Sequence, residues 1–276
     1  MSFGRPLSAG EAAMYESLVV ARYMQAFGEP AVRMLIPSQT AIVAHLGCRT
    51  GYPAGLIAHQ LPGCSLSGVD NSAPALGLAS TKASMLTNIS SSYILAESIP
   101  TPLAAGAFTH TLDLHPAGPK GDYRATFQEH QRLLTGDGQM VASLPLRGSF
   151  PEIYDMLREY ALRHDQPHFG EAVDGAAGGR PNPETLSEQI EGAGFYDVDI
   201  ALNLVAISFE NGRDFLDDPI SRLVVGPDVL ASLSVDRGLE QAWGYAKNAI
   251  SKYWSEIGFD LTLNIGTVSA RKIPQR

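Results

Sequence analysis

The chain has 276 residues, of which 45% are apolar and 18% charged, and this composition indicates a globular protein and excludes a disordered one. Its net charge of −9 at neutral pH disfavours a nucleic-acid partner, because an acidic surface repels phosphate backbones. Two cysteines are too few for a disulfide framework and lack metal-ligand spacing, so we expect a reducing compartment.

The first half of the chain alternates helices with short apolar strands. Ser8 and Glu11 have capping-box spacing, which predicts a helix over 11–27, followed by a short second helix over 31–36. The five strands are expected at 41–46, 65–69, 92–95, 108–114 and 139–144, and the helices between them at 53–60, 73–86 and 123–134. This alternation indicates βαβ units and an α/β fold with a doubly wound, mostly parallel, seven-stranded sheet.

In the second half of the chain, strands and helices no longer alternate regularly. Helices are expected over 150–163, 183–191 and 236–257, and strands over 198–209 and 260–271. The segment 164–182 is rich in glycine and proline without an apolar period, which predicts a lid, a binding loop or disorder, and 211–234 is expected to be irregular. The implied division is an N-terminal helical segment (1–40), a core (41–149 and 183–210), cap insertions (150–182 and 211–257) and a final core strand (258–276).

A glycine-rich turn follows the first strand, at Gly47 and Gly51. Glycine suits this place because the turn requires unusual backbone angles and a ligand must approach the backbone closely. Asp70 follows the second strand about 20 residues later, where an acidic side chain can accept the hydroxyls of a ribose. The alternative is a tight turn without a ligand, but the register of Asp70 favours a nucleoside site.

Six short motifs occur in order between residues 41 and 199. They are the stretches 46–51, 68–72, 96–100, 108–111, 133–138 and 193–198. They resemble L-G-C-G-T-G, G-V-D-x-S, G-D-A-x-x-L-P, F-D-x-V, L-K-P-G-G and A-G-F-x-x-V of the class I S-adenosylmethionine (SAM) methyltransferases, in the small-molecule (type 11) branch that includes ubiquinone- and biotin-pathway enzymes. The resemblance implies a Rossmann-like methyltransferase fold with SAM as cofactor.

The resemblance also implies roles for individual residues. Gly47 and Gly51 would lie against the methionine part of SAM, Asp70 would hold the ribose, and Asn71 would border the adenine. Ala96 and Glu97 would bond the adenine edge, and Leu114 would line the methyl-transfer end. The implied cofactor-binding set, which includes two departures from the family pattern, is His45, Gly47, Arg49, Gly51, Asp70, Asn71, Ala96, Glu97 and Leu114.

Three positions depart from that pattern. His45 replaces the acidic residue that opens the first motif, Arg49 replaces its middle glycine, and Thr109 replaces the aspartate of the fourth strand. Arg49 either clamps a carboxylate of cofactor or substrate, or closes a pocket that now serves as scaffold. A side chain of Arg49 that fills the pocket would favour the second interpretation.

Methyl transfer depends chiefly on positioning, so a strong catalytic motif is not expected. His110, Asp113 and His115 cluster at the end of the fourth strand, and His115 is a candidate base, with an ordinary loop histidine as the alternative. Tyr23 is a candidate for closing the site or, alternatively, a packing tyrosine. No metal site is expected.

Two functions follow. The first is a SAM-dependent methyltransferase acting on a small molecule or a carrier-bound acid. The second is a catalytically inactive protein of the same fold that serves as an adaptor for a protein partner. The sequence shows no signal peptide and no apolar run long enough to span a bilayer, so we expect a cytoplasmic protein without direct membrane insertion.

Overall fold

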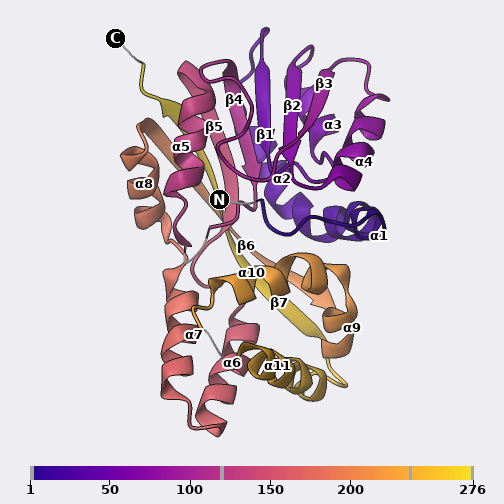
Figure 1. Ribbon diagram of the computed structural model, residues 1–276, viewed down its shortest axis with the longest axis vertical. Helices are drawn as coiled ribbons and strands as arrows, with labels where there is room; N and C mark the ends of the chain where they lie inside the picture. The colour runs from indigo at the N-terminus through magenta and orange to yellow at the C-terminus, as the bar shows by residue number, and fades with distance from the viewer. Residues whose placement is uncertain (1–2, 119–120, 236–237, 275–276) are drawn as a thin grey trace.

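The structure, a computed structural model, describes residues 3–118, 121–235 and 238–274 (Figure 1). Its strands form one sheet in the order β3-β2-β1-β4-β5-β7-β6, in which β7 is antiparallel to both of its neighbours. The strands are β1 (Ile42–Leu46), β2 (Ser65–Asp70), β3 (Ser90–Leu95), β4 (Phe108–Leu114), β5 (Leu134–Pro145), β6 (Phe195–Phe209) and β7 (Phe259–Lys272). The predicted doubly wound, mostly parallel sheet is therefore confirmed.

Helices cover both faces of the parallel part, which explains why its strands read as short apolar runs. The helices on one face are α2 (Gln25–Met34), α3 (Ala54–Gln60) and α4 (Ala73–Ala83), and those on the other are α5 (Arg124–Leu133) and α8 (Pro183–Gly192). β5 begins at Leu134, five residues before the predicted start at Gln139, because Leu134 already pairs with Phe108 across an irregular register.

The N-terminal helical segment is one continuous run and not the two helices predicted. It consists of α1 (Ala9–Met14), the π-helical stretch η1 (Tyr15–Met24) and α2, and it begins with the predicted capping box of Ser8 and Glu11. Tyr23, Phe27 and Ala31 are all fully buried, and their spacing continues one apolar face through the region where a break was expected. The run is therefore a single helix, of which α2 packs against the sheet and α1 packs against α4.

A layer of helices lies beyond one end of the sheet, in the lower half of Figure 1. Its members are α6 (Pro151–Arg163), α7 (Pro167–Gly179), α9 (Gly212–Asp217), the π-helical turn η3 (Ser221–Val225), α10 (Gly226–Ser232) and α11 (Leu239–Tyr253). Two predictions are wrong here, because 164–182 contains α7 and 211–234 contains three helical elements. The predicted start of the last helix, Asp236, lies outside the described residues.

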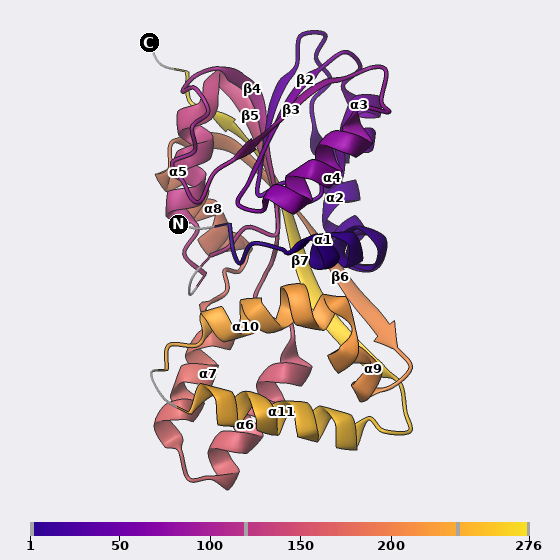
Figure 2. The ribbon, with the colours of Figure 1, turned by 45° about the vertical axis from the view of Figure 1, so that its right-hand side comes forward.

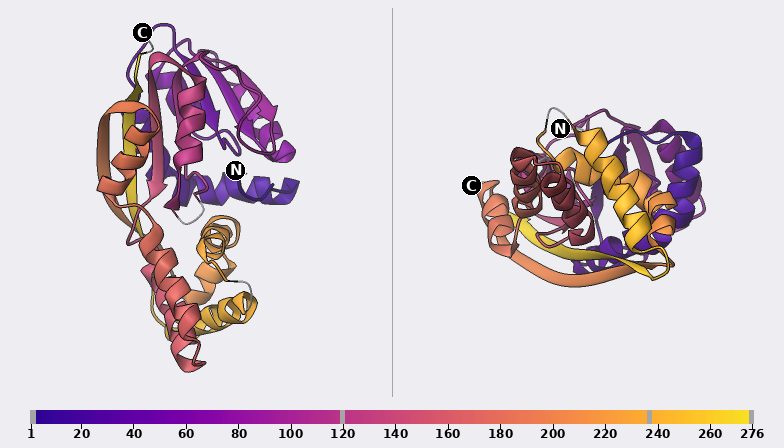
Figure 3. Two further views of the ribbon diagram at one scale, coloured as in Figure 1. Left: turned by 60° about the vertical axis from the view of Figure 1, so that its left-hand side comes forward. Right: turned by 90° about the horizontal axis from the view of Figure 1, so that it is seen from below.

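The long strands β6 and β7 connect the sheet to this helical layer. They pair from Phe195 opposite Lys272 to Phe209 opposite Phe259, and Figure 3 shows them (orange and yellow) along one side of the molecule. Phe209 and Phe259 pack there with Phe215 of α9, so the apolar core continues from the sheet into the layer. Among the described residues, no helix is both long enough and apolar enough to cross a membrane.

Candidate functional site

A cavity of about 580 Å³ lies at the carboxyl ends of β1 and β4. These strands are adjacent in the sheet, and the chain leaves β1 toward β2 on one side and β4 toward β5 on the other. Ligands of open α/β sheets bind in the crevice at such a switch point. The wall opposite the strands is formed by η3 and α10, and the flanks are formed by η1 and the N-terminal segment, which passes between the sheet and α10 in Figure 2.

The two glycines of the predicted loop have different surroundings. Gly47, with φ of +59°, borders the cavity. Gly51, with φ of +81°, faces α4, where an added Cβ would stand 2.7 Å from the Cβ of Ala79. Close helix packing therefore explains Gly51, and only Gly47 is placed to admit a ligand to the backbone.

Asp70 ends β2 beside this loop, as predicted, but its carboxylate is fully buried. It accepts the backbone N–H groups of Arg49 at 3.1 Å and of Ser72 at 2.9 Å, and the Arg49 guanidinium lies 3.6 Å away. Burial raises the pKa of Asp70, while the charge of Arg49 and these hydrogen bonds oppose the rise. The residue implied for the ribose is thus already engaged by the chain itself.

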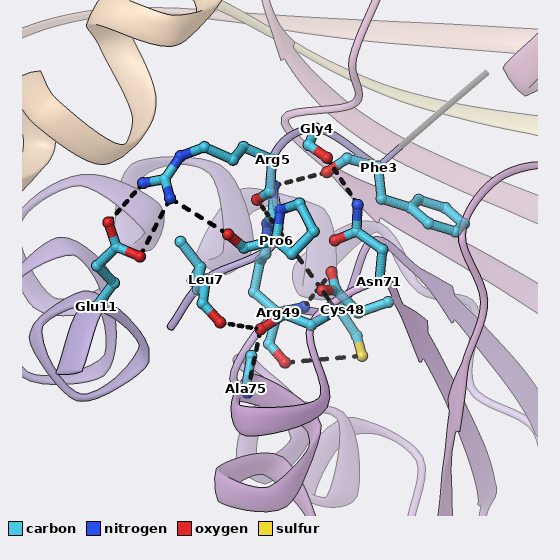
Figure 4. A network of polar contacts seen from close by, with 12 residues as sticks. Phe3, Gly4, Arg5, Pro6, Leu7, Glu11, Cys48, Arg49, Asn71 and Ala75 are labelled. Carbon is cyan, nitrogen blue, oxygen red and sulfur yellow. Dashed lines mark hydrogen bonds and ion pairs between the residues drawn. The ribbon is translucent and has the colours of Figure 1, made fainter. Parts of the chain in front are cut away.

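Residues 3–7, which we call the N-terminal strap, cover this part of the site (Figure 4). The Arg49 guanidinium donates to the carbonyl oxygens of Phe3 at 2.6 Å and Arg5 at 3.1 Å. Asn71 donates from its side-chain amide to the Gly4 carbonyl at 2.7 Å. The Phe3 ring faces Gly47, since an added Cβ there would stand 3.6 Å from it. Arg49 therefore points across the end of β2, between Asp70 and the strap, and not toward solvent.

Three further residues of the implied cofactor set, His45, Ala96 and Glu97, lie outside the cavity lining. His45 is 2% exposed on β1, its Nδ1 atom has no hydrogen-bond partner, and burial lowers its pKa to about 3, so it is a neutral imidazole. The backbone N–H of Ala96 donates to the Asp70 carbonyl at 2.9 Å and is committed to the sheet edge. The side chain of Glu97 is exposed.

The end of β4 provides the open half of the site. Asp113, Leu114 and His115 all line the cavity, whereas His110 bonds the Ile36 carbonyl and faces away. The hydroxyl of Tyr23 lies 2.9 Å from His115 Nε2, so the structure brings these two candidate residues together. Burial lowers the pKa of His115, which favours the neutral form that can accept a proton.

Asp113 is the buried carboxyl group nearest to Gly47, since an added Cβ on Gly47 would stand 3.9 Å from its Oδ1. Its partner on the other side is the His130 ring, whose Nε2 lies 3.8 Å from Asp113 Oδ2. Burial raises the pKa of Asp113. The described residues hold no group of three His, Cys, Asp or Glu side chains placed to bind a metal ion.

Sequence reasoning missed the polar groups on the wall opposite the strands. Asp228 of α10 borders the cavity and pairs at 2.7 Å with Arg180, which is 4% exposed and lies over the Phe150 ring. Ser232 borders the cavity beside them and contacts the Tyr154 hydroxyl at 3.2 Å. Arg180 and Asp228 come from the two segments predicted to be irregular, and no motif marks them.

No family model matches this sequence, and no curated protein matches it. The fold is similar to that of the YcgJ protein from Bacillus subtilis, at a TM-score of 0.55 and 14% identity over 90% of this chain and 98% of that one. It is also similar to Haemonchus contortus phosphoethanolamine N-methyltransferase 2, solved with SAM, at a TM-score of 0.55 and 15% identity over 97% of this chain and 58% of that one.

A third similar structure is the geranyl diphosphate C-methyltransferase of Streptomyces coelicolor, solved with Mg²⁺, geranyl diphosphate and S-adenosylhomocysteine. It matches at a TM-score of 0.50 and 15% identity, over 99% of this chain and 87% of that one. The chain therefore has the Rossmann-like fold of class I methyltransferases, as its motifs suggested. At this level of identity the likeness concerns the fold alone.

Proposed function

We propose that the chain is a SAM-dependent methyltransferase that acts on a small molecule. The observation that supports this most directly is the cavity at the switch point, which Gly47 borders on one side and Asp113 to His115 on the other. Its volume of about 580 Å³ lies within the range of small-molecule sites. Solved proteins of the same fold hold SAM or S-adenosylhomocysteine.

The residues present fit one half of the cofactor better than the other. Gly47 leaves its backbone open to the cavity, so the methionine part has a place beside it. Asp70 and Asn71 would hold the nucleoside part, but Arg49 and the N-terminal strap engage both of them. SAM, when bound, supplies an electrophilic methyl group. The nucleoside part fits only once the strap has moved.

The chain's own groups would position the methyl acceptor. His115 is neutral and held by Tyr23, so it can accept a proton from a hydroxyl or amine acceptor as that acceptor attacks. Asp113, beside Gly47, can orient a hydrogen-bond donor on the acceptor. The mainly apolar lining, which includes Leu114, Met24 and Val224, would exclude water from the reacting groups.

The second candidate is the catalytically inactive protein of the same fold, which binds a protein partner. The observation that favours it is the Arg49 guanidinium, which lies against Asp70 where a ribose would otherwise bind. In this case Arg49 and the strap would be permanent parts of the scaffold, and the cofactor would never enter.

Thermal unfolding with S-adenosylhomocysteine tests the proposal, using the wild type and Arg49→Gly. Ligand at about 100-fold over Kd adds about 2.7 kcal/mol to the free energy of unfolding, which raises Tm by several degrees in a domain of this size. Leu114→Phe should reduce the shift by filling the cavity, whereas the control Leu162→Phe, at a position 83% exposed, should not. No shift at millimolar ligand in either the wild type or Arg49→Gly overturns the methyltransferase proposal and leaves the second candidate.

A further inference from the structure

We infer that the N-terminal strap is an intramolecular competitor of the nucleoside, so that the site alternates between a strap-closed and a ligand-bound form. This inference rests on the proposed function. It differs from a lid, because a lid closes over a bound ligand, whereas this segment occupies groups that the ligand itself would need.

The strap binds by its backbone, in the manner of a ligand. Its carbonyl groups accept hydrogen bonds from three residues that follow β1 and β2, because Arg49 donates to Phe3 and Arg5, Asn71 donates to Gly4, and Ser72 donates to Leu7 at 2.8 Å. These donors surround Asp70, which places the strap on the side of the site that would take the hydroxyls of a nucleoside.

The Phe3 ring supplies the apolar part of this occupancy. It packs against a small buried cluster that contains Leu46 and Val69, and the partly buried Ala96 packs against the same cluster. The ring also faces Gly47, so it borders the place proposed for the methionine part as well. An aromatic ring on these residues takes surface that the flat base of a nucleoside would otherwise cover.

Arg49 is the latch between the strap and the site. Its φ of +46° is unfavourable for a residue with a side chain, and such backbone persists where the surroundings hold it in place. Here the guanidinium is held between the Asp70 carboxylate and two strap carbonyls. Asp70 can accept a ribose hydroxyl only when Arg49 withdraws, so release of the strap and opening of Asp70 are one event.

The strap can leave without unfolding the helix behind it. The helical run starts at Ala9, and the capping box of Ser8 and Glu11 closes its first turn. Glu11 also pairs with Arg5 of the strap at 2.7 Å, so release of the strap breaks this ion pair but leaves the capping hydrogen bonds in place. Gly4, with φ of +83°, gives the strap a flexible point near its beginning. Figure 4 shows the strap beside Arg49 and Asn71, whose side chains donate to its carbonyl oxygens, and residues 3–7 form no strand of the sheet.

Calorimetric titration of S-adenosylhomocysteine into four full-length proteins tests the inference. The apparent Kd equals the intrinsic Kd divided by the fraction of open molecules, so a strap that is closed about 90% of the time weakens binding about tenfold. Arg49→Gly removes the latch at a backbone conformation that glycine favours, and Phe3→Ala removes the ring. Both should bind about tenfold more tightly than the wild type, whereas the control Arg33→Ala, on the exposed face of α2, should not.

The outcomes are separable. Equal affinities in the wild type, Arg49→Gly and Phe3→Ala overturn the competitor inference and leave the proposed function in place. No binding by any of the four proteins, each shown to be folded by its unliganded Tm, overturns the proposed function together with the inference.

Discussion

Two halves of the same sheet edge are occupied in opposite ways. After β1 and β2, the chain's own groups fill the site, with Arg49 and the strap covering Asp70. After β4, Asp113 and His115 face an open cavity. The closed half retains Asp70 of the family motifs but carries Arg49 in place of a motif glycine, and the open half includes His115, which no motif marks. The presence of a motif residue therefore says where a ligand would bind, but not whether the residue is available.

The closed half contains the pair of Asp70 and Arg49, and the wall opposite the strands contains the pair of Asp228 and Arg180. Comparing these two pairs gives the largest expected effect. Asp228→Ala leaves the Arg180 guanidinium buried and unpaired, and such a change typically destabilises a protein by about 3–5 kcal/mol. Asp70→Ala leaves unpaired backbone N–H groups, at about 1–3 kcal/mol, because Arg49 keeps its carbonyl acceptors and partial access to solvent. Urea unfolding measures both, and a larger loss in Asp70→Ala contradicts this account.

Two glycines, Gly51 in the closed half and Gly63 before β2, allow the cost of helix packing to be separated from the cost of backbone conformation. Gly51 and Gly63 have nearly the same φ, +81° and +80°, but a Cβ would meet α4 at Gly51 and nothing within 4 Å at Gly63. We expect Gly63→Ala to lower the free energy of unfolding by about 1–2 kcal/mol. Gly51→Ala should lower it by about 1–3 kcal/mol more through the overlap with Ala79. Equal losses in urea unfolding would show that helix packing does not require Gly51.

The substitution with the smallest expected effect on stability at neutral pH is at His45. This histidine is 2% exposed, whereas His115 lines the cavity. His45 remains neutral in the folded chain down to about pH 3, whereas an unfolded histidine takes up its proton near pH 6.5. Between these values the unfolded state binds more protons, so stability falls as the pH is lowered, by about 1.4 kcal/mol per unit for this group.

His45→Leu should therefore gain stability over the wild type progressively as the pH falls from about 6.5 toward 3, in thermal unfolding at several pH values. Asp70 and Asp113, whose raised pKa values act in the opposite direction, are common to both proteins and cancel in the difference. The control His168→Gln, at an exposed position, should follow the wild-type curve. A constant difference between His45→Leu and the wild type at all these pH values would refute this role for His45.

The strands β1, β2 and β4 could be predicted because they are short apolar runs bounded by glycine and polar residues. β4, at Phe108–Leu114, has the predicted bounds, and β1 and β2 differ from the prediction by one residue at one end. α7 was missed because glycines interrupt its sequence, although Phe169, Val173 and Ala176 are buried at helical spacing. The helical spacing of these three apolar residues would have identified the helix if the glycines between them had not been taken as breaks.

The site was predictable only where one local segment specifies it. The positions of Gly47 and Asp70 follow from strand ends, and both lie where the motifs implied. The strap was not predictable, because the contact between Arg49 and Phe3 joins residues 46 positions apart and leaves no local pattern. The pair of Arg180 and Asp228 joins residues 48 positions apart and was missed for the same reason.

The paired strands β6 and β7 form a rigid connection between the sheet and the helical layer that contains α10. With 15 and 14 residues at about 3.3 Å each, they are roughly 50 Å long. Their register is unbroken from Asp199 to Phe209, so no bulge interrupts the strand pair between Asp199 and the helical layer. Swinging that layer away from the sheet would bend a whole ladder of hydrogen bonds at once. We therefore expect a ligand to enter and leave by displacement of the five-residue strap, while the helical layer keeps its position relative to the sheet.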